Sequence, residues 1–337
     1  MGVGIWRSGH RNGVRSVTGS RDAPLTREAR PGVSRRRHTH NPPGVAEHLF
    51  HQRTSSVSCE ATPPHHLLAR PGDPEIREEF QLRRKMGIEL EFYDATAVRA
   101  RFPFLRPAAL FSKVGGQVDP HRLTHGLLAA GKRAGLEVYD RTKMTRLEET
   151  RRGVRITTHN GCRITARRVV IAAGFESEPL LNAGAGTLKS TYALISEPLP
   201  KISGWHRQCL IWESGMPYLY LRTTTEGRII VGGEDENFMN AKRRDALISQ
   251  KARTLVKKFG RLFPDRPLEV AYAWAGTFGE TKDGLPYIGV HPRFPHVCFA
   301  LCYGGNGITF SVIAAEIIRN YFLGKENRDA HLIRFGR

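Results

Sequence analysis

The strongest constraint on the fold lies near the end of the chain, in residues 297–318. The apolar run VCFAL is followed by the glycine-rich stretch YGGNG and then by the largely apolar run ITFSVIAAEII. This order predicts a buried strand, a tight loop and a helix, the βα unit of α/β proteins. Such a loop lets backbone N–H groups approach a negatively charged ligand at a helix start, although a simple tight turn gives the same pattern.

A second buried strand is predicted at residues 169–174. The run VVIAAG has no polar side chain, which is typical of a parallel strand that is covered on both faces. It ends in Ala173 and Gly174, at the strand end where open α/β sheets bind their ligands. The two runs together favour a parallel sheet with a ligand at its carboxyl edge.

Residues 188–278 have a different pattern, in which short runs alternate polar and apolar side chains. This predicts an antiparallel sheet. Tyr218, Tyr220 and Arg222 occupy every second position of one strand, so they share a face, which is either a binding face or an ordinary half-exposed one. A basic amphipathic helix is predicted at residues 240–260, and its charge is more typical of a solvated face than of a nucleic-acid site.

Local signals predict where several elements begin and end. Asp119 and Pro120 are typical of a helix start, and Gly135 is typical of its end. Asp94 predicts the start of a shorter helix. The pair Asn160–Gly161 between alternating runs predicts a type I′ hairpin turn.

The first 66 residues do not continue these patterns. Residues 1–70 contain eleven Arg but no Lys, with six Pro and only four acidic residues, and turn formers interrupt every apolar run. Such a segment buries little apolar surface, which predicts disorder. Three interpretations stay open: a basic arm that binds nucleic acid or membrane, a transit peptide, and a stretch read outside its natural frame. The lack of Lys favours the third, with the nucleic-acid arm next.

Composition bears on partners and compartment. The net charge of +20 suits an anionic cofactor as well as nucleic acid. The cysteines are Cys59, Cys162, Cys209, Cys298 and Cys302, and no two form a CxxC pair. This predicts free thiols in a reducing compartment, with no disulfide frame and no metal site. No apolar run of about 18 residues and no signal-peptide pattern is present, so we expect a cytoplasmic protein without a membrane span.

Five stretches together resemble one known family: GGQVDPHRLTHGLL, RRVVIAAGFES, YLYLRTTTEGRIIVGGEDE, WAGTFGETKDGLPYIG and YGGNGITFS. In order and spacing they are similar to the D-amino-acid-oxidase-type family of FAD-dependent oxidoreductases, in the branch of glycine, sarcosine and γ-glutamylputrescine oxidases. The resemblance spans about residues 67–319.

The resemblance implies an α/β fold of α+β character. It has a Rossmann-like three-layer FAD-binding domain, incomplete at its N-terminus, and an antiparallel β-sheet substrate domain. The implied FAD-binding domain comprises residues 67–187 and 279–325, and the substrate domain comprises residues 188–278. Residues 1–66 form a disordered, basic segment, which is not native if the third interpretation holds.

The resemblance also implies the residues of the site. The late glycine loop faces the pyrimidine edge of the flavin of FAD with Gly304, Gly305, Asn306, Gly307, Ile308 and Thr309. The other implied cofactor contacts are Gly284, Pro286 and Ile288 beside the flavin, Ala173 and Gly174 near the dinucleotide, and the backbone of Met144 at the adenine. The implied substrate-binding residues are Tyr218, Tyr220, Arg222, Phe278 and Tyr303.

The family's reaction implies oxidation of a C–N bond of an amine or amino acid. A hydride passes from the substrate to flavin N5, and oxygen or another acceptor reoxidises the flavin. No acid–base residue is assigned. Many members carry an Arg just after WAG that clamps the substrate carboxylate, whereas this chain has Thr277 and Phe278 there. This favours an amine, or a substrate whose carboxylate lies farther from the reacting carbon and within reach of Arg222.

The first strand and GxGxxG loop of the family are not recognisable in this chain. Gly2 and Gly4 begin such a pattern, but Arg7 replaces the third glycine and no apolar helix follows. Because that loop anchors the pyrophosphate, we expect this chain to bind FAD poorly or not at all, and its activity to suffer accordingly. Two alternatives stay open: a flavin-free remnant or small-molecule-binding protein that retains the substrate sheet, and a basic nucleic-acid-binding protein.

Overall fold

The computed structural model describes residues 2–6, 14–18, 65–68, 75–112, 116–181, 186–199, 204–214 and 218–337. For the first three of these ranges it describes the backbone alone. The chain divides into two compact units. The first comprises Met1–Ser58, Asp119–Leu188 and Phe278–Arg337, and the second comprises Cys59–Val118 and Lys189–Thr277.

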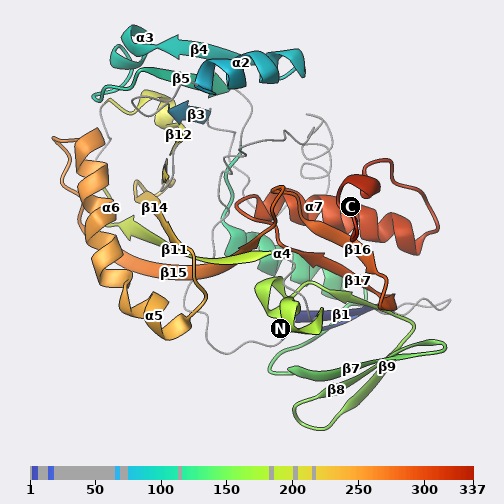
Figure 1. Cartoon of the computed structure of the whole chain (residues 1–337). Coiled ribbons are helices and arrows are strands. Elements are labelled where there is room, and N and C mark those ends of the chain that lie inside the picture. Colours follow the sequence, from blue (N-terminus) through green and yellow to red (C-terminus); the bar gives the residue numbers. More distant parts are fainter. Residues whose placement is uncertain are drawn as a thin grey trace. The chain divides into compact units, whose positions relative to one another are not determined.

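The first unit contains a mixed sheet and a small meander. Its elements are β1 (Gly2–Trp6), β2 (Val14–Thr18), α4 (Pro120–Arg133), β6 (Glu137–Tyr139), β7 (Met144–Thr150), β8 (Gly153–Thr158), β9 (Arg163–Ala166), β10 (Arg168–Ile171), η1 (Gly174–Leu180), β16 (Tyr287–His291), β17 (Phe294–Leu301), α7 (Gly307–Phe322) and η3 (Ala330–Leu332). The six-stranded sheet has the order β16-β17-β10-β1-β2-β6, and β7, β8 and β9 form a separate sheet (Figure 1).

The two apolar runs form neighbouring parallel strands, as the sequence predicts. β10 pairs with β17 in parallel, with Val170 opposite Cys298. Phe299 packs in one buried cluster with Ile156 of the meander, and Cys298 packs in another with Ala314 of α7. Because both faces of this strand pair are covered, both strands need continuous apolar sequence.

Local capping in this unit follows the sequence, but one turn does not. Asp119 caps α4 by accepting hydrogen bonds from the N–H groups of His121 and Arg122 at 2.9 and 3.0 Å. The predicted type I′ turn is wrong, because such a turn needs positive φ at both central residues. Only Gly161 of the predicted pair has positive φ, at 80°. The loop is instead closed by the N–H of Thr158, which donates to the carbonyl of Cys162 at 3.0 Å.

The N-terminal strands lie between β10 and β6 in the sheet. β1 pairs antiparallel with β10 and with β2, and β2 pairs in parallel with β6. Residues 2–6, 14–18 and 65–66 thus depart from the disorder expected for residues 1–66, while most of that segment lies outside the described residues. Gly2 and Gly4 lie within β1, where Gly4 is opposite Val170 and Ser16. They are paired strand residues and not a loop at a helix start.

The second unit is built on one large sheet. Its elements are β3 (His65–Leu68), α2 (Glu75–Lys85), β4 (Leu90–Asp94), α3 (Ala95–Arg99), β5 (Ala108–Ser112), β11 (Thr187–Ser196), η2 (His206–Gln208), β12 (Leu210–Glu213), β13 (Leu219–Thr223), β14 (Ile229–Glu236), α5 (Ala241–Ala246), α6 (Ile248–Leu262) and β15 (Val270–Glu280). The sheet has the order β15-β11-β14-β13-β12-β3-β5-β4. The predicted antiparallel pairing is present for β11, β14, β13 and β12.

The basic helix covers one face of this sheet. Leu255 and Phe259 of α6 are fully buried in a cluster with Leu194, Leu221 and Val231 of the strands. The predicted single helix at residues 240–260 is two helices, α5 and α6, which meet at Leu247.

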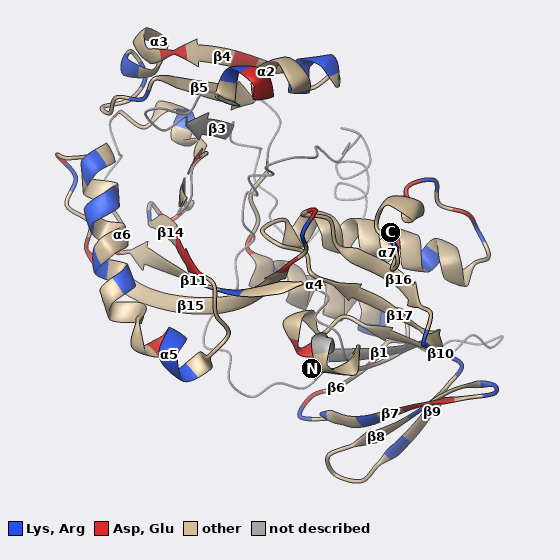
Figure 2. Cartoon of the chain, in the orientation of Figure 1, with Lys and Arg blue, Asp and Glu red and all other residues tan. Residues whose placement is uncertain are grey.

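Figure 2 shows the positive charge along α5 and α6. Part of this charge is neutralised, because Lys258 and Lys251 both form ion pairs with Glu234. Burial by itself raises the pKa of Glu234, but the two lysines outweigh burial and lower it.

One boundary differs from the sequence-based division. Residues 75–112 belong to the second compact unit, whereas the sequence analysis assigns residues 67–187 to the FAD-binding domain. The reason is strand pairing: β5 pairs with β3 and β4, and β3 pairs with β12 of the large sheet. Asp94 caps α3 as predicted, by accepting a hydrogen bond from the Ala97 N–H at 2.8 Å. In the described ranges, no helix is long and apolar enough to cross a membrane.

Candidate cofactor and substrate site

The glycine loop of the first unit leads into a helix start that lacks a cap. Gly304 has a φ of 55°, and its N–H donates to the carbonyl of Gly279 at 3.0 Å. Tyr303 forms an antiparallel bridge with Glu280. Asn306 precedes α7, but its side chain makes no capping hydrogen bond. The N–H groups in the first turn of α7 therefore have neither intrahelical acceptors nor a side-chain cap.

Gly304 and Gly307 face open space. A Cβ atom at either position would meet none of the neighbouring protein atoms within 4 Å. Gly307 has no positive φ, so neither backbone conformation nor packing requires glycine there. A glycine in a helix interior costs roughly 0.5–1 kcal/mol relative to alanine, which is an upper bound for Gly307 as the first residue of α7. The loop also includes Gly305, Ile308 and Thr309. The open Cβ position of Gly307 leaves the start of α7 free of a side chain at this residue, as close approach of an anionic ligand edge requires.

Tyr303 at the start of this loop is half-buried. Its ring centroid lies 6.1 Å from that of Phe310. Burial raises the pKa of the Tyr303 phenol above its usual value, although a hydrogen bond with Ser311 acts in the opposite direction. The phenol is therefore neutral near pH 7 and can donate a hydrogen bond but cannot serve as a base.

The turn between β15 and β16 is held by Arg337. The guanidinium donates from Nε and Nη2 to the two carboxylate oxygens of Asp283 at 2.8 and 2.9 Å, and from Nη1 to the Pro286 carbonyl at 2.9 Å. The N–H of Leu285 also donates to Asp283, at 3.1 Å. The Arg337 guanidinium holds the pKa of the Asp283 carboxyl well below its usual range.

The same turn carries Gly284, another glycine with open space at its Cβ position. Gly284 has a φ of 74°, and a Cβ there would meet no protein atom within 4 Å. Pro286 follows, and Ile288 is buried in β16, where its N–H donates to the Ile333 carbonyl at 2.8 Å. Sequence reasoning found the turn but missed Arg337, because no local pattern relates it to a turn 54 residues earlier.

The carboxyl end of β10 carries the third group of sequence-predicted cofactor residues. Ala173 follows the strand, and Gly174 has a φ of 59° with open space at its Cβ position. Ser177 in η1 is fully buried, and its hydroxyl has no hydrogen-bond partner among the described residues. Met144 is buried at the start of β7, in the cluster beneath β10. Contact of its backbone with an adenine stays a prediction.

The second unit carries three of the five implied substrate-binding residues, whereas Phe278 and Tyr303 belong to the first unit. Tyr220 and Arg222 are half-buried on β13, whereas Leu219, Leu221 and Thr223 between and beside them point into the core. The Tyr218 and Tyr220 rings lie 6.3 Å apart. Arg222 donates from Nη1 to Oε1 of Gln117 at 3.3 Å. The predicted shared face is present; its role in substrate binding stays a prediction.

The two residues after WAG point in opposite directions from β15. Thr277 is buried, and its hydroxyl accepts a hydrogen bond from Nη1 of Arg244 at 2.9 Å. This arginine comes from α5, on the side where Ala275 packs against the core. Strand alternation places Phe278 on the opposite side, together with Gly276. Neither Thr277 nor Phe278 therefore supplies a guanidinium on the side of β15 that carries Gly276 and Phe278.

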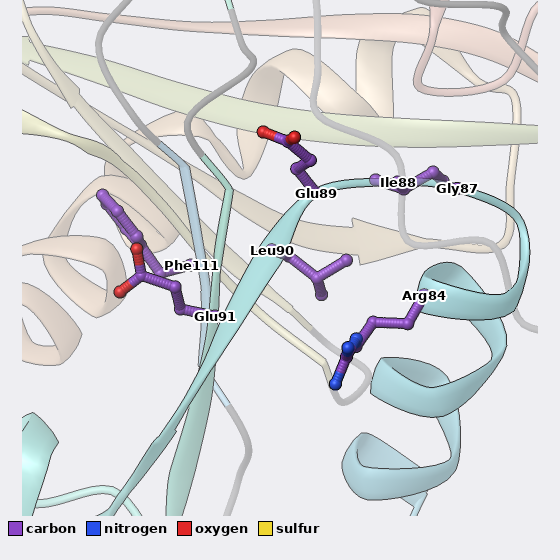
Figure 3. Close-up of a pocket in the computed structure, with 7 residues that line it drawn as sticks. All are labelled: Arg84, Gly87, Ile88, Glu89, Leu90, Glu91 and Phe111. Carbon is purple, nitrogen blue, oxygen red and sulfur yellow. The ribbon is translucent and has the colours of Figure 1, made fainter.

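A cavity of about 390 Å³ lies elsewhere in the second unit. Figure 3 shows its lining, which comprises Arg84, Gly87, Ile88, Glu89, Leu90, Glu91 and Phe111. None of these residues belongs to the predicted site, so the cavity does not mark it. Within the described ranges, no three His, Cys, Asp or Glu side chains gather as a metal site would require.

Comparison with known proteins identifies the fold and the family. A family model described as FAD dependent oxidoreductase matches residues 3–321. The chain belongs to the family of FAD-dependent oxidoreductases. The match begins at residue 3, so it takes in the N-terminal segment that lies outside the resemblance seen in the sequence.

Two relatives and one solved structure illustrate the family. The glycine oxidase of Bacillus subtilis is 27% identical over 276 residues, which cover 76% of this chain and 70% of that enzyme. The gamma-glutamylputrescine oxidoreductase of Escherichia coli is 27% identical over 251 residues, which cover 71% of this chain and 56% of that enzyme. The crystal structure of glycine oxidase from Geobacillus kaustophilus superposes with a TM-score of 0.74 at 19% identity, covering 88% and 80% of the two chains.

FAD is the cofactor of this family, and the residues of this FAD-dependent oxidoreductase fit its two ends differently. At the start of α7, which the resemblance assigns to the flavin, a Cβ on Gly307 would occupy space that no neighbouring protein atom fills within 4 Å. After β10, which the resemblance assigns to the dinucleotide, the buried hydroxyl of Ser177 has no partner among the described residues. The family's pyrophosphate loop would lie between the first strand and a following helix. In this chain β1 is instead followed by antiparallel β2, and only residues 7–13 lie between the two strands. A parallel βαβ crossover needs about a dozen residues or more, so the described strands leave no such unit there.

Proposed function

We propose that this chain oxidises the C–N bond of an amine or amino acid as an FAD-dependent oxidoreductase. The observation that carries the proposal is the open start of α7, where Gly307 keeps backbone N–H groups clear for an anionic edge. Membership of the family and relatives named for glycine, sarcosine and gamma-glutamylputrescine support the same reaction class.

The proposed roles of this chain's residues are binding and orientation. When bound, FAD supplies the hydride acceptor of the reaction. The N–H groups of Gly307, Ile308 and Thr309 stabilise negative charge at the flavin edge, because they lie at the positive end of the α7 dipole. The pair of Asp283 and Arg337 fixes the turn that carries Gly284. The neutral phenol of Tyr303 can donate a hydrogen bond near the start of the loop.

The substrate we propose is an amine, or an amino acid whose carboxylate lies away from the reacting carbon. Thr277 is occupied by Arg244 and Phe278 carries no charge, so neither offers the carboxylate clamp found in many relatives. Arg222 lies beside Tyr220 on the half-buried face of β13 and is oriented by Gln117. It is the guanidinium we assign to a distant anionic group of the substrate.

The test is anaerobic reduction of the protein after loading with FAD. Glycine, sarcosine and a diamine such as putrescine are added in turn, and loss of the yellow flavin absorbance is followed. We expect at least one amine to bleach the flavin, and admission of air to restore the colour if oxygen is the acceptor. A protein that retains FAD but is bleached by none of these amines would contradict the proposed reaction.

A second candidate is a flavin-free protein that binds a small molecule on the sheet of the second unit. The antiparallel pairing of β1 favours it, because no described βαβ unit holds a pyrophosphate. Flavin content separates the two candidates. A purified chain that takes up no flavin at saturating FAD, yet still binds an amine, supports the second and excludes the first.

A further inference from the structure

One row of residues crosses four strands on the half-buried face of the second unit. Trp212 of β12 is directly opposite Tyr220 of β13, which is opposite Gly232 of β14, which is opposite Ala193 of β11. All these strand pairs are antiparallel, so the four side chains share one face. The row therefore holds two large aromatic residues followed by the two smallest side chains available.

Gly232 is required by the ring of Tyr220. A Cβ at Gly232 would lie 2.1 Å from both Cζ and Oη of Tyr220 and 2.6 Å from its Cε2. Gly232 does not have a positive φ, so its backbone conformation suits any residue. The glycine is therefore a steric requirement, because the far end of the Tyr220 ring occupies the space where a Cβ would lie.

Gly276 provides a comparison in the same sheet. A Cβ there would meet only Cγ2 of Thr191, at 3.7 Å, which is ordinary van der Waals contact. It also points away from the face that carries Ala275. The demand for glycine at position 232 is thus specific to its pairing with Tyr220.

We propose that Gly232 is a positioning residue that seats the Tyr220 ring against the sheet and thereby sets how much room this face leaves for the substrate. The substrate part of this inference rests on the proposed function; the seating of the ring does not. A Cβ at position 232 displaces the ring, because the atoms it meets are the far end of a side chain and not backbone. Because Trp212 is opposite Tyr220 on β12, we expect the displaced ring to move outward from the sheet.

An alternative is that the ring covers Gly232 only to stabilise the sheet, as aromatic residues do opposite strand glycines. Both interpretations expect Gly232→Ala to lower the melting temperature. They differ in the substrate selectivity of a variant that stays folded. Only the positioning role expects bulky substrates to lose more than small ones when the ring is raised.

The first experiment measures the ring itself. Wild type, G232A and G276A are treated with tetranitromethane, and nitration of each tyrosine is located by mass spectrometry. We expect the nitration rate of Tyr220 to rise several-fold in G232A and to stay unchanged in G276A, with Tyr272 as the internal reference. The double variant G232A/Y220A should recover the melting temperature of Y220A alone. An unchanged Tyr220 rate, or a double variant as unstable as the sum of its single changes, overturns the seating.

The second experiment measures selectivity on the FAD-loaded protein. The KM for glycine and for the bulkier N-benzylglycine is compared among wild type, G232A and G276A. We expect G232A to raise the KM for N-benzylglycine about tenfold more than that for glycine, with kcat for glycine kept, and G276A to change neither ratio. Equal changes for both substrates overturn the positioning role. If wild type oxidises neither substrate, the proposed function fails for them, while the nitration result still decides the seating.

Discussion

At the scale of single residues, the candidate site is shaped by its glycines and, at one turn, by an ion pair that fixes the backbone. Gly284 and Gly307 leave open space, whereas Gly232 is filled by a neighbouring ring. The turn of Gly284 is held by Asp283, which is itself held by Arg337. The sequence does not distinguish an open glycine from a filled one. Only the atoms around each glycine in the structure do so.

We expect Asp283→Asn to destabilise the first unit by about 2 kcal/mol at pH 7, because a two-pronged charge-assisted pair with Arg337 is lost. The folded pKa of Asp283 is depressed. Its contribution is therefore present above the unfolded value of about 3.9 and is lost as the pH falls towards the folded pKa. Melting temperatures of wild type and D283N should converge below about pH 4.

The matched control is Asp140→Asn. Asp140 also pairs with an arginine, Arg141, but the two side chains are 77% and 72% exposed. We expect a change within about 0.5 kcal/mol. A D283N variant that is no less stable than D140N at pH 7 would show that the Arg337 contacts do not fix the turn.

At the scale of elements, two helices are used differently. α7 follows β17 through a glycine loop and leaves its N-terminus open. α6 lies on the core of the second unit, and its lysines reach a buried carboxylate of β14. The sequence predicts both helices. Only the structure shows that α7 has an uncapped N-terminus and that α6 is covered along one face by the core.

Gly307→Ala separates helix stability from ligand binding. We expect the flavin-free protein to become slightly more stable, by up to about 0.5–1 kcal/mol, because alanine is the better helix former. FAD affinity should fall at least about tenfold (1.4 kcal/mol), since the new Cβ fills the cradle. Thermal unfolding and flavin-fluorescence titration measure the two effects.

Gly260→Ala in α6 is the control for that change, because its Cβ position is also open. It should stabilise the protein to a similar degree and leave FAD affinity unchanged. If G307A binds FAD as well as wild type does, the open helix start is not the flavin cradle.

Adjacent lysines of α6 provide another matched pair. Lys258 forms an ion pair with the buried Glu234, whereas Lys257 is exposed. We expect Lys258→Ala to cost about 1–2 kcal/mol, because Glu234 stays buried with fewer partners, and Lys257→Ala to cost less than about 0.5 kcal/mol. Urea denaturation compares the two, and equal losses would contradict a specific role for the Glu234 pair.

At the scale of the whole molecule, two compact units carry different parts of the proposed chemistry. The first has the glycine loop, the Asp283 turn and the carboxyl end of β10, and the second has the face of Tyr220 and Arg222. In the first unit, antiparallel β1 and β2 lie between β10 and β6. A dinucleotide site needs a parallel strand and a helix start at this place.

We therefore expect the ADP half of FAD to add little to binding. The dissociation constants for FAD and for riboflavin should differ by less than about tenfold (1.4 kcal/mol). Quenching of flavin fluorescence measures both, with Gly307→Ala as a variant that weakens both ligands alike. FAD that binds more than about a hundredfold tighter than riboflavin would mean that the pyrophosphate is anchored after all.

Much of the fold and part of the candidate site follow from local sequence. Two all-apolar runs predict parallel buried strands, and both form. Asp119 and Asp94 predict helix starts, because a cap depends on bonds to the next few residues. Period-two spacing predicts that Tyr220 and Arg222 share a face. These features share one physical cause, in that each depends on interactions within a few residues or on burial of a periodic pattern.

The remainder was decided only by tertiary structure, because it depends on partners that are distant in the chain. Pairing of β3 with β12 places residues 75–112 in the second unit, and Arg337 reaches back to Asp283. Whether a glycine is open or filled depends on atoms from another strand, as Tyr220 does for Gly232. The sequence by itself determined the strands, the helix starts and the glycine loop, and the three-dimensional packing decided which of its glycines face open space and which are filled by a neighbouring side chain.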